Sequence, residues 1–126
     1  QMATRFVCTT ECDVHADFKQ AYISAENEDI TIINSPVGLP GRVIRNEFTR
    51  RVLKGETIPF RCPFHCLRSC NPRTAPYCIA KVLADASKGM LLDSFVFAGS
   101  NAYRCTEIVS VKTLVNQLKE ELSNAL

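Results

Sequence analysis

The fold class follows from the opening stretch Met2-Ala3-Thr4-Arg5-Phe6-Val7-Cys8, a short apolar run that three polar residues then close. Such a run predicts a buried β-strand. Asp13 is a suitable N-cap for a helix, and apolar residues recur at helical spacing from Val14 to Ala25. Residues 1–27 therefore predict one strand followed by one helix, the repeating unit of α/β proteins.

The middle of the chain also alternates between extended and helical segments. Residues 30–33 are all β-branched and typical of a strand, and residues 35–41 form a loop rich in Pro and Gly. We expect residues 42–54 to form a basic amphipathic helix that Gly55 ends. Its inward face is Val43, Ile44, Phe48 and Val52.

Two more helices are expected in the second half of the chain. Pro76 suits the first turn of a helix that runs to about Ser87. Residues 95–98 form a short strand or extended segment, and a turn at 99–101 follows. Ser110 caps the last helix, whose apolar side chains share one face: Val111, Leu114, Val115, Leu118 and Leu122.

This order contains too few strands for a free-standing α/β domain, because a parallel sheet of two or three strands would expose its edges and its faces. We therefore expect residues 1–126 to be a single segment, the last part of a larger α/β protein. Residues 1–27 would supply its last strand and helix. Residues 28–126 would form a mainly helical C-terminal extension with a cysteine-rich loop at 61–78.

Composition excludes several classes of function. The 15 basic and 13 acidic residues give a net charge of +2, which provides neither a basic footprint for nucleic acid nor a polybasic membrane anchor. The apolar runs are far shorter than the roughly 20 residues that span a bilayer. Seven cysteines, an odd number, and an opening unlike a secretory signal favour unpaired thiols in a reducing, cytoplasmic compartment.

The cysteine-rich loop has two interpretations. Cys62, Cys66, Cys70 and Cys78 have the spacing C-x3-C-x3-C-x7-C, and a helical turn from Pro63 would bring the first three thiols onto one face. Four thiolates could then hold zinc or an Fe–S cluster, although the spacing matches neither usual signature. We favour the alternative of free structural thiols in a loop held by the burial of Phe60, Phe64, Leu67 and Tyr77.

Three stretches, in the same order, resemble those of a known family. Gln1-Met2-Ala3-Thr4-Arg5-Phe6 is similar to the last barrel strand, usually Gln/Asn-Met-Gly-Thr-Arg-Phe, of the nitronate monooxygenases (2-nitropropane dioxygenases) and of related FMN-dependent enoyl reductases. Residues 38–48 resemble the family segment Gly-Arg/Leu-Pro-Ala/Gly-Arg-x-x-Arg-Asn. Residues 97–102 resemble its Ala-Gly-Gln-x-x-Gly ending.

This resemblance implies the C-terminal part of an FMN-dependent (β/α)8 barrel of the TIM type. In such barrels the loops after strands 7 and 8 hold the phosphate of the cofactor. The resemblance implies that FMN is bound by Met2, Ala3, Thr4, Gly99 and Ser100. Ala3 stands where the family usually has Gly, so it would be strained if that position required a positive φ.

The activity implied by the resemblance is the oxidation of alkyl nitronates with oxygen. The catalytic His of the family lies in a Gly-Gly-His-type context that this chain lacks, and neither His15 nor His65 matches it. No catalytic residue is therefore assigned, and we expect the chain alone to be inactive. Two alternatives stay open: an FMN-dependent enoyl-thioester reductase of the same barrel, and a stand-alone cysteine-cluster module that binds metal or a partner protein.

Overall fold

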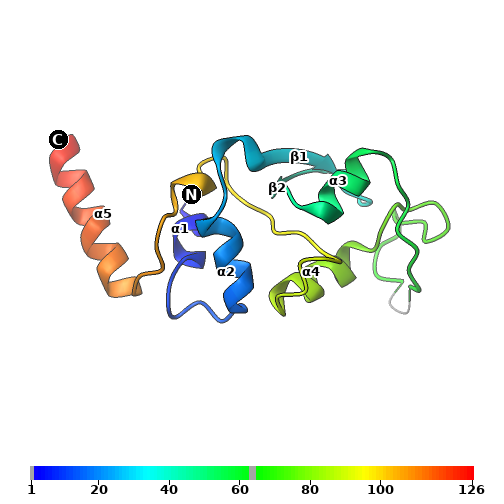
Figure 1. The fold of residues 1–126 in the computed structure, drawn as a ribbon, viewed down its shortest axis with the longest axis horizontal. Coiled ribbons are helices and arrows are strands. Elements are labelled where there is room, and N and C mark those ends of the chain that lie inside the picture. Colours follow the sequence, from blue (N-terminus) through cyan, green and yellow to red (C-terminus); the bar gives the residue numbers. More distant parts are fainter. Residues whose placement is uncertain (1, 63–64) are drawn as a thin grey trace.

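The structure is a computed structural model that describes residues 2–62 and 65–126. The molecule is elongated, with helix α5 at one end and the cysteine-rich loop at the other (Figure 1). Its elements, in chain order, are α1 (Ala3–Val7), α2 (Ala16–Ile23), the 3-10 helix η1 (Asn27–Asp29), β1 (Ile30–Asn34), β2 (Pro40–Ile44), α3 (Glu47–Leu53), α4 (Ile79–Ser87), the 3-10 helix η2 (Ala102–Arg104) and α5 (Val111–Ala125).

Strands β1 and β2 form an antiparallel hairpin in the middle of the molecule, which confirms the strand predicted at 30–33. Ile30 lies opposite Ile44, and Asn34 lies opposite Pro40. In the turn, the Ser35 N–H donates to the Leu39 carbonyl at 3.1 Å. Gly38 has a φ of 84°, a left-handed conformation that other residues rarely adopt.

A third extended segment lies beside β2, as the pattern of residues 95–98 predicts. The Ile44 N–H donates to the Val96 carbonyl at 3.0 Å, and the Ala98 N–H donates to the Arg42 carbonyl at 3.0 Å. The prediction of one helix over residues 42–54 is therefore wrong at its start. Because β2 finds hydrogen-bond partners on both sides, its backbone is satisfied as a strand, and the helix α3 begins only at Glu47.

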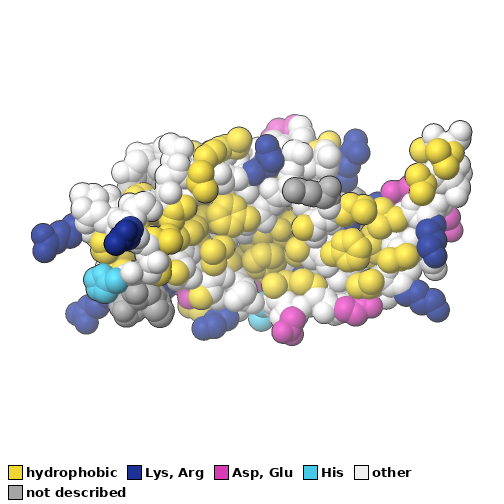
Figure 2. Space-filling model, turned by 180° about the vertical axis from the view of Figure 1, so that it is seen from behind, with side chains coloured by type: hydrophobic (Ala, Val, Ile, Leu, Met, Phe, Trp, Pro, Cys, Tyr) yellow, Lys and Arg dark blue, Asp and Glu magenta, His cyan; other side chains and the backbone are white. Residues whose placement is uncertain are grey.

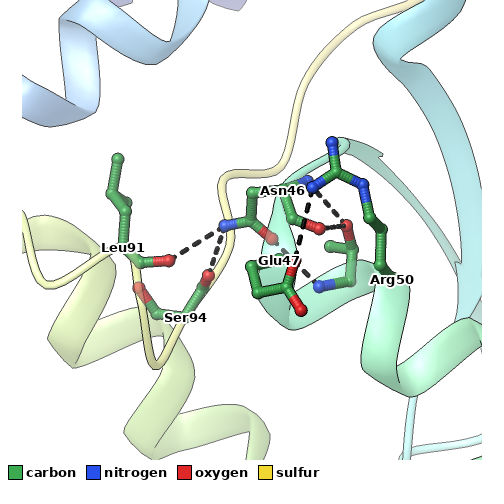
Figure 3. Close-up of polar contacts among 6 residues, drawn as sticks. Asn46, Glu47, Arg50, Leu91 and Ser94 are labelled. Atoms are coloured by element: carbon green, nitrogen blue, oxygen red, sulfur yellow. Dashed lines mark hydrogen bonds and ion pairs between the residues drawn. The ribbon is translucent and has the colours of Figure 1, made fainter.

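Asn46, from the Arg-Asn pair of the segment that resembles the family, fixes this transition from strand to helix (Figure 3). Its side-chain oxygen accepts from the Thr49 N–H at 2.9 Å, while its own N–H donates to the Thr49 hydroxyl at 2.8 Å, which makes a reciprocal N-cap. The Asn46 side-chain amide also donates to the Leu91 and Ser94 carbonyls at 3.0 and 2.7 Å. Asn46 thus ties α3 to the segment that leads into the third extended segment.

The core consists of two apolar clusters on either side of β2. Since successive side chains of a strand point to opposite faces, Val43 enters one cluster and Ile44 the other. The first cluster contains Ile33, Val43, Phe48, Tyr77, Val82 and Phe95. The second contains Cys8, Tyr22, Ala25, Ile44, Val96 and Ala102. Strand β2 therefore joins the hairpin half of the molecule to the half that carries α1 and α2.

The strand predicted at residues 2–8 is not present: residues Ala3–Val7 form the short helix α1. Within the described residues, only Thr9 makes a strand-like contact in this region, a parallel bridge to Val109. With no neighbouring strand alongside residues 3–7, their backbone groups are satisfied by helical hydrogen bonds instead. Sequence alone does not distinguish these states, because a short apolar run suits either a strand or a helical turn.

The other predicted helices exist with shifted starts. Helix α2 begins at Ala16, with His15 rather than Asp13 as its N-cap, and α4 begins at Ile79 rather than Pro76. Ser110 caps α5 as predicted, its hydroxyl accepting from the Thr113 N–H at 3.1 Å. On the apolar face expected for α5, only Leu114 is buried.

Apolar side chains also reach the surface elsewhere, and Figure 2 shows hydrophobic atoms along much of one face of the molecule. Large exposed examples include Met2, Leu39, Leu92 and Leu122. Among the described residues, no helix is long and apolar enough to cross a membrane.

Candidate cofactor cleft

An open cleft of about 780 Å³ is lined by residues of α1, of the turn before η2, and of α5. In Figure 1 these elements occupy the end of the molecule where α5 stands apart from the body. The residues that line it include Met2, Thr4, Arg5, Cys8, Gly99, Ser100, Asn101, Arg104, Cys105, Glu107, Gln117, Glu120 and Glu121.

One hydrogen bond joins the two sides of the cleft that come from opposite ends of the chain. The Gly99 N–H donates to the Thr4 hydroxyl oxygen at 3.1 Å. The approach is so close that a Cβ atom at Gly99 would lie 2.6 Å from that oxygen. A side chain at position 99 would therefore force the Thr4 hydroxyl to move, and α1 and the turn at 99–101 are held together at one point.

Four of the five residues predicted to bind a cofactor line this cleft: Met2, Thr4, Gly99 and Ser100. Ala3 is the first residue of α1 and is not among the lining residues. The strain considered for Ala3 does not arise, because His65 is the only non-glycine residue of the described chain that has a positive φ. The structure thus brings together segments from residues 2–4 and 99–100, and it leaves Ala3 facing elsewhere.

The cleft is also lined by two arginines that were not among the residues predicted to bind the cofactor. The Arg5 guanidinium donates to Glu121 at 2.7 Å and to the Gln117 side-chain oxygen at 3.4 Å, which connects α1 to α5. This contact lowers the pKa of the Glu121 carboxyl below its ordinary value. Arg104 lies on η2 on the other side, next to the turn that contains Gly99. The carboxylates of the cleft lie along α5 and at Glu107.

Two thiols also line the cleft, and they perturb each other. Hydrogen bonding with Cys105 and burial raise the pKa of Cys8, whose side chain is 3% exposed. Hydrogen bonding from Cys8, with a smaller contribution from the Arg5 charge, lowers the pKa of Cys105 to about 7. Cys8 is a buried core residue, whereas Cys105 is only half-buried. No local pattern around Cys105 marks this pairing in the sequence.

The cysteine-rich loop does not assemble a metal site within the described residues. Across 2–62 and 65–126, no three His, Cys, Asp or Glu side chains converge in a way that would hold an ion. All seven cysteines are free thiols, with Cys66 exposed and Cys78 buried at the start of α4. The helical turn proposed to begin at Pro63 falls outside the described residues, as does Phe64.

The apolar packing expected for this loop is present only in part. Tyr77 is buried against the rings of Phe48 and Phe95, at centroid distances of 5.6 and 5.7 Å. Leu67 is 42% exposed, so it does not anchor the loop as expected.

Comparisons with known proteins identify the family of this chain and structures with a similar fold. A family model for nitronate monooxygenase matches residues 1–121, so the chain belongs to the nitronate monooxygenase family of oxidoreductases. No curated protein matches the sequence.

Two solved structures of FabK from Thermotoga maritima share the fold. A point mutant has a TM-score of 0.68 and 23% identity over 97% of this chain. A second FabK structure has a TM-score of 0.67 and 24% identity over 98% of this chain. The match covers 32% and 38% of those chains, so the present chain spans about a third of their length.

Proposed function

We propose that this chain is the C-terminal part of an FMN-dependent (β/α)8-barrel oxidoreductase that oxidises alkyl nitronates with oxygen, and that its cleft contributes to the binding of the FMN phosphate. Membership of the nitronate monooxygenase family supports the reaction class. The observation that carries the site is the meeting of Thr4 and Gly99 in one cleft, since the resemblance had singled out both segments for cofactor binding.

The residues present fit a phosphate group. The Thr4 hydroxyl accepts from Gly99, which leaves its proton available to donate to a phosphate oxygen. Arg5 and Arg104 add positive charge on the same two elements, and guanidinium groups suit phosphate because they donate in a planar fork. The cleft volume of about 780 Å³ lies within the range usual for cofactor sites.

Charge also suggests which part of the cleft the phosphate would occupy. Glu120 and Glu121 on α5 would repel a phosphate, although Arg5 already pairs with Glu121. The opposite side, formed by Thr4, the turn at 99–101 and Arg104, carries no acidic group among its own residues. We therefore assign the phosphate to that side and not to α5.

The chemistry divides between the cofactor and this chain. When bound, FMN supplies the acceptor for the electrons of the nitronate. The residues described here bind and orient the phosphate end of the cofactor. His15 caps α2 through a hydrogen bond from the Asp17 N–H, and so it has a structural role. On this proposal the base that removes the α-proton comes from outside residues 1–126, since neither His15 nor His65 matches the family's Gly-Gly-His-type context.

The experiment that tests this function is the expression of the full-length protein that contains these residues. It should purify with bound FMN, identified by its absorption spectrum and by mass spectrometry of the released cofactor. Oxygen uptake should then depend on added alkyl nitronate. A colourless protein with no oxygen uptake would overturn the proposal.

The alternative, an FMN-dependent enoyl-thioester reductase, would use the same cofactor cleft. The likeness to FabK is one of fold alone at 23–24% identity, so it does not favour that reaction over nitronate oxidation. The same preparation decides between them. Oxidation of a reduced nicotinamide that depends on an enoyl thioester, without nitronate-dependent oxygen uptake, would establish the alternative.

A further inference from the structure

Strand β1 forms the open edge of the sheet and runs along the outer margin of the molecule (Figure 1). The opposite edge, formed by residues 96–98, is closed by Tyr22, whose hydroxyl donates to the Phe97 carbonyl at 2.5 Å. No residue of β1, Ile30–Asn34, is charged, and none is proline or glycine. Exposed edges usually carry such residues, which prevent pairing with another chain. The edge of β1 lacks this protection.

The backbone groups that β1 presents along this edge follow from its pairing with β2. Hydrogen bonds in an antiparallel pair alternate, so every second residue turns its N–H and carbonyl away from the partner strand. The Arg45 N–H donates to the Asp29 carbonyl at 2.7 Å, which sets the alternation. In the register of the hairpin, the residues that point outward are therefore Ile30, Ile32 and Asn34. The middle one, Ile32, is also 53% exposed.

Only part of this outward row is already hydrogen bonded. The Ile30 N–H donates to the Asn27 carbonyl. The Asn34 carbonyl accepts from the Tyr77 hydroxyl at 3.2 Å. Within residues 2–62 and 65–126, no partner is found for the Ile30 carbonyl, for the Asn34 N–H, or for either backbone group of Ile32.

We propose that β1 pairs with β1 of a second copy of this chain, antiparallel about a two-fold axis at Ile32, so that the two sheets become one. In this register Ile32 lies opposite Ile32 of the second copy, and Ile30 lies opposite Asn34. Each outward group without a partner then meets another such group of the opposite kind. The Ile30 N–H and the Asn34 carbonyl, which would face each other, are the two groups that are already bonded. The edge is therefore complementary to itself.

Neighbouring two-fold registers do not match in this way. An axis at Thr31 would place Ile32 opposite Ile30, so the Ile32 carbonyl would face an N–H that is already bonded. An axis at Ile33 would place Ile32 opposite Asn34, so the Ile32 N–H would face a carbonyl that is already bonded. The pattern of occupied groups thus selects the axis at Ile32.

Charge is compatible with the same register. The acidic residues just before β1, at positions 26, 28 and 29, would lie beside residues 35–38 of the second copy, which are uncharged. Like charges directly opposite each other would weaken such pairing, and none meet here. The association should therefore depend little on salt. This inference does not rest on flavin binding, because β1 does not line the cofactor cleft.

The test uses the full-length protein that contains these residues. Sedimentation velocity over a range of protein concentrations should show an equilibrium between monomer and dimer that changes little in high salt. Hydrogen exchange with residue resolution locates the interface. The Ile32 and Asn34 amides should exchange more slowly as the protein concentration rises. The Thr31 and Ile33 amides, which point toward β2, are the internal control and should not change.

Variants of Ile32 separate edge pairing from folding. Ile32→Pro removes an N–H that the hairpin does not use, so it should raise the dissociation constant of the dimer about tenfold or more while the Thr31 and Ile33 amides stay protected. Ile32→Lys places two like charges at the axis and should have the same effect. Ile32→Val, the matched control, keeps a β-branched apolar side chain and should still form the dimer.

Three results would overturn the proposal. The first is a protein that stays monomeric at every concentration. The second is a dimer that neither Ile32→Pro nor Ile32→Lys weakens, since it would use another surface. The third is an Ile32 amide that is protected equally at all concentrations in a monomer, which would show that another part of the protein covers the edge. The exchange measurement on the wild-type protein decides the matter even if a variant does not fold.

Discussion

Replacing Gly99 with alanine tests the contact that joins the two sides of the cleft. The added methyl group would lie 2.6 Å from the Thr4 hydroxyl oxygen, whereas ordinary contacts begin near 3.4 Å. Thr4 must then turn its hydroxyl away, and the Gly99 N–H loses the acceptor that it now has at 3.1 Å.

The cost can be worked out from these contacts. Losing a hydrogen bond costs about 1 kcal/mol, and crowding adds roughly 1–3 kcal/mol where neighbours cannot move freely. Alanine also stabilises the folded state by about 0.4–1 kcal/mol relative to glycine, because it restricts the unfolded chain more than glycine does. Together these contributions predict that Gly99→Ala reduces the free energy of unfolding by roughly 1–3.5 kcal/mol, with the lower value expected if the Thr4 side chain rotates freely.

The assay is urea denaturation of the purified protein in a double-mutant cycle with Thr4→Ala. Removing the Thr4 hydroxyl also removes the clash, so the double variant should be more stable than the sum of the single costs predicts, by about 1 kcal/mol. Costs that simply add, or a Gly99→Ala protein as stable as the wild type, would refute the account of this contact.

Three other outcomes are expected. The 126-residue chain alone should not bind FMN tightly, since it holds only part of the phosphate site; stoichiometric quenching of flavin fluorescence would contradict this. Phe95→Ala should lower the free energy of unfolding by about 3–5 kcal/mol, because Phe95 is fully buried against three aromatic rings, while the part-exposed Phe6→Ala should cost far less in the same urea titration. Anaerobically purified protein should contain no stoichiometric zinc or iron; metal that is bound stoichiometrically and lost in Cys66→Ser would show that the thiols of the loop are ligands.

The elements that sequence predicts correctly are those set by neighbouring residues. The strand at 30–33 follows from β-branched residues, and the start of α5 follows from the Ser110 cap. The two segments assigned the wrong kind of secondary structure, residues 2–8 and 42–46, are short apolar runs whose state depends on distant partners. Strand β2 forms because β1 and residues 96–98 hydrogen bond to it on either side. The sequence of residues 42–46 alone does not indicate that these partners are present.

The candidate site likewise combines residues that local motifs indicate with contacts that depend on distant parts of the chain. Resemblance to a family pointed to Thr4 and Gly99 separately, but their hydrogen bond joins residues that lie far apart in sequence and emerges only from the fold. Arg5 was within the quoted motif, yet its position in the cleft depends on Glu121 at the other end of the chain. The pairing of Cys8 with Cys105 has no local signal at all.

Comparing FMN with riboflavin, which lacks the phosphate, tests whether this cleft binds the phosphate of FMN. In the full-length protein, Arg104→Gln should raise the dissociation constant of FMN about tenfold or more, since a charged hydrogen bond contributes roughly 1.5–3 kcal/mol. The affinity for riboflavin should not change, and Arg50→Gln, on α3, should alter neither. If Arg104→Gln weakens both flavins equally, or neither, the phosphate does not lie in this cleft.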